Sequence, residues 1–233
     1  MEIRIYSLLE GAQQAKGTVL IVDVFRAFTT ASVAFQQGVS KIVFFADPDD
    51  ALALRAAGKA DFCAGEVGGI PPEGYDFGNS PHELATAEQN GKEIRGKVMA
   101  HSTRAGTVGV NAAVHADRIY GCSLANAQAT VQAIKEEGPA LVSIVAMGLA
   151  GKERADEDEM CAIYLRNLLE GRKTDHDAVR KVILSGHEVL KYSSDEHPHL
   201  YMEDLAHALN IDGINQVVRI EEEEGLLIAR PQG

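Results

Sequence analysis

Thr18-Val-Leu-Ile-Val-Asp-Val24 is the stretch of sequence from which the fold class follows. Its residues are mostly β-branched and are apolar on both faces, which is typical of a strand buried in a parallel sheet. The polar residue Asp23 comes near its end, and residues 26–35 then read as a helix that stops at Gly38. This order predicts a buried strand followed directly by a crossover helix.

The same alternation of strand-like and helical segments continues along the chain. Further strands are predicted at 2–6 (an edge strand), 41–46, 60–64, 97–102, 118–122 and 140–147. Helices are predicted from Asp47-Pro48, near 105–114 and at 125–136. This rhythm predicts an α/β protein with a three-layer, largely parallel sheet and helices on both faces.

The pattern changes after Asp156. Residues 158–169 and 175–184 look helical, and 198–209 could be helical, while 217–220 and 226–229 form a hairpin around acidic residues and Gly225. The sequence has no internal repeat and no linker. We therefore expect a single α/β domain, 1–233, with the core sheet and active-site loops in 1–155 and a helical and hairpin C-terminal extension, 156–233, packed on it.

Composition excludes several classes of function. The chain has 233 residues, of which 45% are hydrophobic and 24% charged, and a net charge of −12 without any basic block. Nucleic-acid binding is therefore not expected, because it depends on Lys and Arg. No apolar run approaches the ~20 residues that cross a bilayer, and no signal peptide is visible. The three cysteines are widely spaced, so we expect a cytoplasmic protein without disulfides.

A long loop, Gly65-Glu-Val-Gly-Gly-Ile-Pro-Pro-Glu-Gly-Tyr-Asp-Phe-Gly-Asn-Ser-Pro81, interrupts the alternation. Its five glycines and three prolines exclude a helix or a central strand. A long loop in a compact domain usually binds a ligand or takes part in catalysis. An ordered loop without chemistry is the alternative. The polar candidates in this loop are Glu66, Asp76, Asn79 and Ser80.

Polar residues also gather where the predicted strands end. In an open α/β sheet this edge carries the ligand site. The residues at this edge are Asp23, Arg26, Glu66, His101, Ser102, Thr103, Arg104, Gly106, Thr107, Ser123, Asn126, Gly148, Gly151, Lys152, Arg154 and the acids 156–159. Helix capping explains some of them equally well, and the helix dipole favours acids at a helix start. Arg26 at a helix start needs a nearby carboxylate or a bound anion. His197 and His199 are interpreted as surface residues.

The residue types at this edge indicate chemistry on phosphate. Carboxylates are hard ligands that suit Mg²⁺, whereas Arg, hydroxyls and backbone N–H groups suit phosphate oxygens. The sequence has no GxxxxGK[ST] motif and no clear GxGxxG after the first strand, so nucleoside triphosphates and dinucleotides are not favoured. We therefore expect Mg²⁺ and a small anionic phosphorylated substrate.

Six segments also carry a family resemblance. They are 23–30, 65–66, 74–81, 102–107, 123–126 and 157–158, in that order. From about Val19 to Leu165 the chain resembles 2-phosphosulfolactate phosphatases. The resemblance implies a fold particular to that family and Mg²⁺-dependent hydrolysis of 2-phosphosulfolactate in coenzyme M biosynthesis. Arg often follows the Glu66 position in that family; Val67 stands there in this chain, and we hypothesise that Arg104 supplies the cation.

These arguments give each candidate residue a hypothetical role. Glu66, Asp158 and Asp23 are the expected Mg²⁺ ligands. The catalytic candidates are Asp23, Arg26, Ser102, Thr103, Gly106 and Thr107, and the substrate-binding candidates are Asp76, Asn79, Ser80, Arg104 and Asn126.

Three questions stay open at this point. Asp23 would either attack phosphorus or activate water. There are three alternative functions. The protein could be a phosphatase for another phosphorylated hydroxy acid, a hydrolase or lyase that acts on a non-phosphorylated acid, or a non-catalytic anion-binding protein. A homodimer is permitted by apolar segments such as 226–229.

Overall fold

The computed structural model describes residues 1–232, and ten strands in it form one sheet. The strands are β1 (Glu2–Ser7), β2 (Gly17–Val22), β3 (Lys41–Phe45), β4 (Phe62–Gly65), β5 (Phe77–Gly78), β6 (Val98–Ser102), β7 (Ala116–Cys122), β8 (Leu141–Ala146), β9 (Val218–Glu223) and β10 (Leu226–Ala229). Their order across the sheet is β1-β8-β2-β7-β9-β10-β3-β6-β4-β5.

Helices connect the strands and follow the last parallel one. They are α1 (Leu8–Gln14), α2 (Ala27–Gln36), α3 (Pro48–Ala56), α4 (Pro81–Ala85), α5 (Gly106–Ala112), α6 (Ala127–Glu137), α7 (Asp156–Leu169), α8 (His176–Leu184), α9 (His187–Leu190), the 3₁₀ turn η1 (Lys191–Ser193) and α10 (Met202–Ala208). No helix within residues 1–232 combines the length and apolar composition needed to cross a bilayer.

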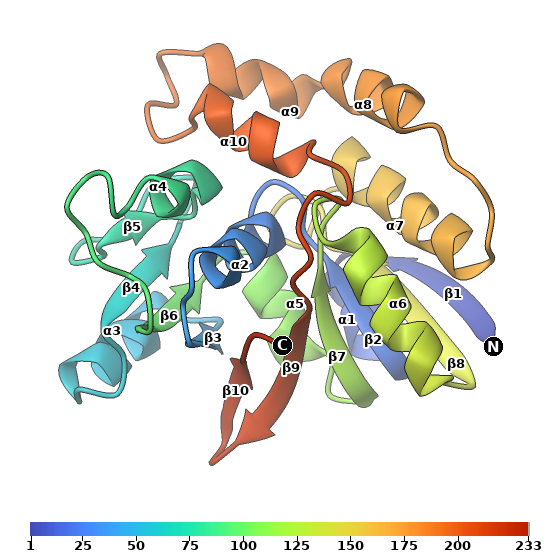
Figure 1. Ribbon diagram of the computed structural model, residues 1–233, viewed down its shortest axis with the longest axis horizontal. Helices are drawn as coiled ribbons and strands as arrows, with labels where there is room; N and C mark the ends of the chain where they lie inside the picture. Colours follow the sequence, from blue (N-terminus) through green and yellow to red (C-terminus); the bar gives the residue numbers. More distant parts are fainter. Residues whose placement is uncertain (233) are drawn as a thin grey trace.

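The sheet consists of two parallel blocks joined by the β9–β10 hairpin. Strands β1, β8, β2 and β7 pair in parallel, as do β3, β6, β4 and β5. The hairpin pairs antiparallel with β7 on one side and with β3 on the other (Figure 1). The α/β class and the mostly parallel sheet are confirmed. The expectation that the hairpin belongs to an extension packed on the sheet is wrong, because the hairpin lies inside the sheet.

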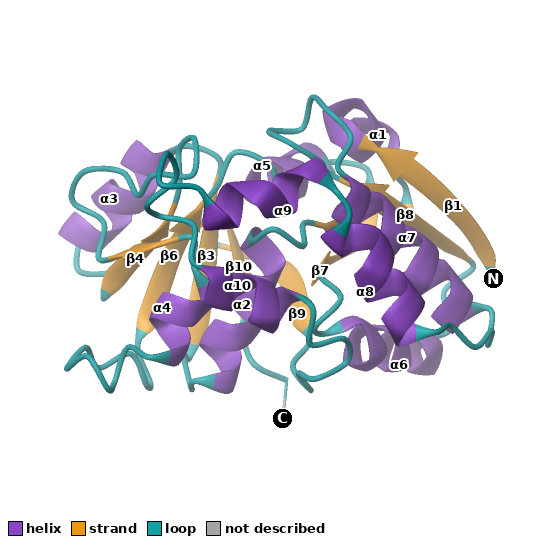
Figure 2. Cartoon of the chain, turned by 90° about the horizontal axis from the view of Figure 1, so that it is seen from above, coloured by secondary structure: helices purple, strands orange, loops and turns teal. Residues whose placement is uncertain are grey.

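The curl of the sheet brings the ends of the two blocks together. Three antiparallel pairings separate β7 from β3, so the blocks run in opposite directions along the sheet. The sheet is curled like half of a barrel, and this shape was not part of the predicted three-layer arrangement (Figures 1 and 2). As a result Asp23, just after β2, accepts a hydrogen bond from the Gly106 backbone N–H, just after β6, at 2.8 Å.

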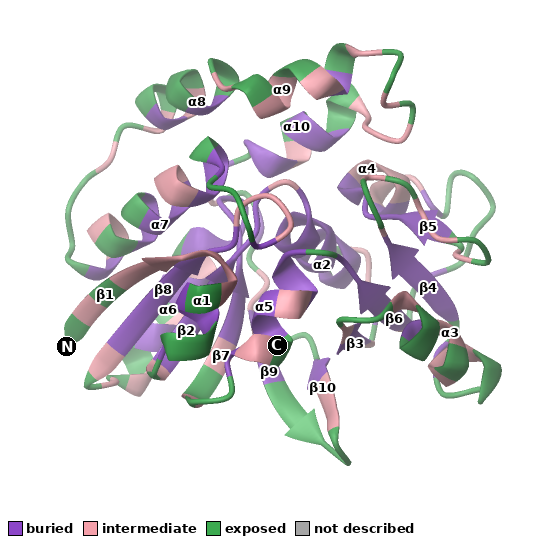
Figure 3. Cartoon of the chain, turned by 180° about the vertical axis from the view of Figure 1, so that it is seen from behind, coloured by how far each residue is buried: buried purple, intermediate pink, exposed green. Residues whose placement is uncertain are grey.

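Strand β2 is buried on both faces, as its composition predicts. Val19 and Ile21 pack into one apolar cluster, whereas Leu20 and Val22 pack into another. Alternate side chains of a strand point to opposite faces, so helices must cover both sides of this block. Strands β2 and β8 are accordingly buried along nearly their whole length, while the tip of the hairpin is exposed (Figure 3).

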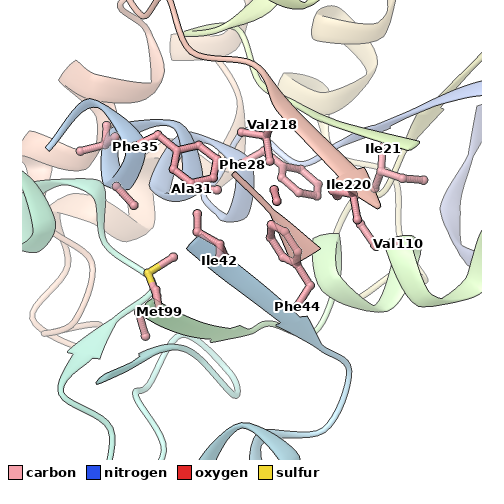
Figure 4. Close-up of a cluster of buried hydrophobic side chains, with 14 of the residues drawn as sticks. Ile21, Phe28, Ala31, Phe35, Ile42, Phe44, Met99, Val110, Val218 and Ile220 are labelled. Carbon is pink, nitrogen blue, oxygen red and sulfur yellow. The ribbon is translucent and has the colours of Figure 1, made fainter. Parts of the chain in front are cut away.

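The core around the hairpin explains its position. Val218 and Ile220 of β9 share a cluster with Phe28 of α2 and with Ile42 and Phe44 of β3 (Figure 4). Gly121 on β7 makes room for the Phe28 ring, since a Cβ there would lie 2.2 Å from Phe28 Cδ1. Burying these side chains fixes the hairpin between the two blocks.

Candidate active site

A cavity of about 430 Å³ lies where the carboxyl ends of the two blocks meet. The sheet side of its wall contributes Asp23, Arg26, Glu66, Asn79 and Arg104. The C-terminal segment contributes Glu188, Lys191, Tyr192, Glu196, His197 and His199, among others. The predicted convergence of residues from several strand ends is therefore present, although it arises from a curled sheet and not from one flat edge.

Asp23 is held rigidly at the floor of this cavity. Its Oδ1 accepts a hydrogen bond from the Ala27 N–H at 3.0 Å, and its Oδ2 accepts one from Gly106. Gly106 is required for this approach, because a Cβ there would lie 2.7 Å from Ala27 Cβ. Burial raises the pKa of Asp23 to about 6, and the charge of Glu66 adds to this, although the two N–H groups and Arg26 oppose it.

Glu66 faces the same cavity from the end of β4. Its Oε2 accepts the Gly69 N–H at 2.7 Å, and its Oε1 accepts the Arg104 N–H at 3.0 Å. The Arg104 guanidinium lies 3.6 Å from Glu66 Oε2 and is half exposed. Val67 is 48% exposed and is not part of the cavity wall. Arg104 therefore supplies a positive charge to the cavity wall, whereas position 67, occupied by Val67, supplies none.

Arg26 pairs with a carboxylate that is distant in the sequence. Its Nη1 donates to Asp204 Oδ2 at 2.6 Å and to the His199 carbonyl at 3.1 Å. Asp204 also accepts hydrogen bonds from the Ser80 hydroxyl at 2.6 Å and from the His82 N–H at 3.1 Å. This buried carboxylate thus ties α2, the loop before α4 and α10 together. In the sequence Asp204 is only one residue of the possible helix at 198–209, and nothing local marks it as a partner of Arg26.

Asp158 lies behind the cavity. Its Oδ1 accepts the Val24 N–H and its Oδ2 accepts the Gly148 N–H, both at 2.8 Å. Burial raises its pKa well above the ordinary value, and Asp23 and Glu157 add to this effect. Burial likewise raises the pKa of Glu157 to about 7. Buried carboxyl groups are thus concentrated next to the cavity, a pattern often found at functional sites.

The hydroxyl residues at the end of β6 and just after it form hydrogen bonds within the protein. Thr107 Oγ1 accepts the Thr103 N–H at 2.8 Å, and Thr103 Oγ1 accepts the Thr107 N–H at 3.2 Å. Ser102 Oγ lies 2.5 Å from the Tyr75 hydroxyl. All three side chains are buried, and none belongs to the cavity wall. They shape the turn that holds Gly106 and Asp23; a direct role in catalysis stays a prediction.

Three of the predicted substrate-binding residues lie away from the cavity wall. Asp76 pairs with Arg55 and accepts the Cys63 N–H, and it is partly exposed. Ser80 is buried, caps α4 by accepting the Glu83 N–H at 3.1 Å and donates to Asp204. Asn126 is buried and accepts the Ser123 N–H at 2.8 Å. Asn79 and Arg104 are the members of that group in the wall.

The C-terminal segment contributes to the cavity wall, which was not predicted from the sequence. His197 and His199 line the cavity and are partly buried, so their interpretation as surface residues is wrong. Lys191 also lines it, with its Nζ 2.7 Å from both Glu188 carboxylate oxygens. This segment crosses over the strand ends in Figure 2. The helical part, α9 and η1, is too short to show a hydrophobic period in the sequence.

The residues present fit Mg²⁺ only in part. Among residues 1–232, no three His, Cys, Asp or Glu side chains are grouped as metal ligands, and Asp158 is not part of the cavity wall. Asp23 and Glu66 do face the cavity. Mg²⁺ is usually bound by one or two carboxylates together with substrate phosphate and water. The donor set of Asp23 and Glu66 fits this mode of binding.

Fold and cavity together define an α/β protein with a polar cavity, lined by carboxylates and cations, at the carboxyl ends of its strands. Comparison with known proteins makes this more specific. The model of the 2-phosphosulpholactate phosphatase family matches residues 4–223. The chain therefore belongs to the 2-phosphosulfolactate phosphatase family, whose activity is that of a phosphoric monoester hydrolase.

Individual relatives agree with this assignment, and each is described as a probable 2-phosphosulfolactate phosphatase. The protein of Bacillus subtilis is 29% identical over 167 residues, which cover 70% of this chain and 69% of the relative. That of Thermoplasma volcanium is 32% identical over 68% of this chain and 70% of its own length. That of Thermus thermophilus is 34% identical, and the match spans 60% of this chain and 56% of the relative.

Proposed function

We propose that this protein hydrolyses 2-phosphosulfolactate to sulfolactate and phosphate with the help of Mg²⁺, a reaction that belongs to coenzyme M biosynthesis. One observation carries the proposal. Asp23 and Glu66, from the ends of different blocks, share a cavity with the cations Arg104 and Lys191. Such a mixture suits a phosphate ester that bears further acidic groups.

The charges of the wall support a requirement for a divalent cation. The wall contains more acidic than basic side chains available to a ligand. The acids are Asp23, Glu66, Glu188 and Glu196, and the bases are Arg26, Arg104 and Lys191. Arg26 is already paired with Asp204. A substrate with phosphate, carboxylate and sulfonate groups would meet repulsion from these acids. Mg²⁺ held by Asp23 and Glu66 would neutralise phosphoryl charge and orient water.

The chain's own residues then have definable roles. Asp23 is oriented by two backbone N–H groups, and this carboxylate of fixed direction would act as nucleophile or as base toward water. Arg104, beside Glu66, donates to phosphoryl oxygens. Lys191, from the C-terminal segment, pairs with the acidic end of the substrate.

Phosphate release tests this proposal. The purified protein is incubated with 2-phosphosulfolactate, 2-phospholactate or phosphoglycerate, with Mg²⁺ and then with EDTA. We expect Mg²⁺-dependent release that favours the sulfonated substrate. Phosphate release from the other two acids alone would support phosphatase activity and contradict a role in coenzyme M biosynthesis. Absence of release from all three would favour a binding role on the same scaffold.

A further inference from the structure

His101 lies on β6 behind the cavity and is completely buried. Its Nε2 is 3.3 Å from Asn79 Oδ1, and its Nδ1 has no hydrogen-bond partner in the described part of the chain. The Phe44 ring packs beside it, with the ring centroids 6.0 Å apart. Burial lowers the pKa of His101 to about 3, so the imidazole is neutral at ordinary pH.

A neutral imidazole carries one N–H, and the contacts determine where it is. If the proton were on Nδ1, a buried donor would be left without an acceptor, which is rare and costly. With the proton on Nε2, the ring donates to Asn79 Oδ1 and leaves one acceptor, Nδ1, unpaired instead of a donor. The geometry therefore selects the Nε2–H tautomer.

Asn79 has the complementary arrangement. It is 4% exposed and forms part of the cavity wall. Its Oδ1 is taken by His101, while its Nδ2 has no protein partner among residues 1–232 and is not sealed from solvent. Its N–H₂ group is thus an unpaired donor on a residue of the cavity wall that also contains Asp23 and Glu66.

We propose that His101 is a positioning residue that holds Asn79 with its amide N–H₂ turned into the cavity, where this group donates to a phosphoryl oxygen. The identity of the anion rests on the proposed function. Without His101, the Asn79 amide can rotate and present Oδ1, an acceptor that repels an anion. Because both groups are neutral, the contact adds no charge next to a cavity already rich in carboxylates.

Two His101 variants separate positioning from packing. His101→Gln keeps an N–H donor at about the place of Nε2, whereas His101→Leu keeps bulk without a donor. We expect His101→Leu to raise KM and the inhibition constant of inorganic phosphate about tenfold, with a smaller effect on kcat. His101→Gln should stay within about threefold of the parent protein. Met99→Leu, on the same buried strand face, is the packing control and should leave KM unchanged.

Asn79→Ala completes the test. It should weaken phosphate binding as much as His101→Leu, and the double variant should lose nothing more. Nitrogen NMR of the parent protein should show an Nε2-protonated His101 that does not titrate between about pH 5 and pH 8.

Three outcomes would overturn the positioning role. They are an Nδ1–H tautomer, an equal loss in His101→Gln and His101→Leu, and additive losses in the double variant. If phosphate binds with the expected dependence but no ester is hydrolysed, the positioning role stands and the proposed function alone fails.

Discussion

Arg26 Nη1 lies 2.6 Å from Asp204 Oδ2, and the two side chains are 3% and 0% exposed although 178 residues separate them in the sequence. This ion pair joins the start of α2 to α10. It also binds the Ser80 hydroxyl and the His199 carbonyl, so one pair links the start of α2, the loop before α4 and the C-terminal segment.

Asp204→Ala is expected to destabilise the protein by about 3–5 kcal/mol, because it leaves a buried guanidinium without its carboxylate. Urea unfolding measures the loss. Arg55→Met is the matched control, since the Arg55–Asp76 pair is partly exposed and should contribute less than about 1 kcal/mol. Equal losses in the two variants would contradict the structural role of the buried pair.

Asp23→Asn is expected to lower kcat by roughly 10²–10⁴-fold while the protein stays folded, because a positioned carboxylate is replaced by a neutral amide. The amide has a single acceptor oxygen, so one of the two N–H groups that now bind Asp23 loses its partner. Circular dichroism checks the fold, and phosphate release checks the rate. Activity near that of the parent protein would remove Asp23 from the chemistry.

Mg²⁺ should raise the melting temperature, and Glu66→Gln should abolish that increase because a cavity carboxylate is lost. Asp158→Asn serves as the comparison, since Asp158 binds Val24 and Gly148 N–H groups. It should lower stability by about 1–3 kcal/mol and keep the Mg²⁺ effect. Loss of the Mg²⁺ effect in Asp158→Asn would instead support the ligand role predicted from the sequence. Melting curves with Mg²⁺ and with EDTA provide the measurement.

Lys191→Met should raise KM for 2-phosphosulfolactate about tenfold, because one charge-assisted contact to the acidic end is lost. Inhibition by inorganic phosphate should change less than about twofold, since phosphate lacks that end. Lys181→Met, on α8 outside the cavity wall, is the charge-matched control. An equal loss of phosphate and substrate binding would place Lys191 at the phosphoryl group.

His101 should also make stability depend on pH. Its pKa is about 3 in the folded protein, against an ordinary value of 6.5. Protonation therefore favours the unfolded chain, and stability present above about pH 6.5 is lost as the pH falls toward 3. Between about pH 6.5 and pH 5 the loss is roughly 2 kcal/mol. In urea titrations, the free energy of unfolding of His101→Gln should fall less over that interval than that of the parent protein. An identical fall would show that other groups cause the pH dependence.

Local sequence was sufficient for most elements of the two parallel blocks, although β5 lies in the segment read as a loop and α1 was not predicted. The apolar run before Asp23 predicted a strand buried on both faces, and β2 is one. Asp47 before Pro48 predicted a helix start, and Asp47 caps α3 by accepting the Asp49 N–H. These features depend on neighbours along the chain, which a pattern can show.

Features that depend on distant partners were not visible. The hairpin pairs with β7 and β3 through contacts far apart in sequence, so its strands were predicted but its place was not. Leu226–Ala229, thought available for a dimer, pairs within the sheet, and a homodimer stays a prediction. Likewise Lys191 reaches the cavity, and Asp204 reaches Arg26, only through the path of the C-terminal segment.

The position of the β9–β10 hairpin sets the order in which the protein can be completed during synthesis. Val218–Ala229 leaves the ribosome after all the strands that it joins, so β7 and β3 each present an unpaired edge until then. Unpaired edges invite pairing with other chains. A nascent chain that ends before the hairpin is therefore an aggregation-prone molecule with a divided cavity, and the last strands to be made are those that close the sheet.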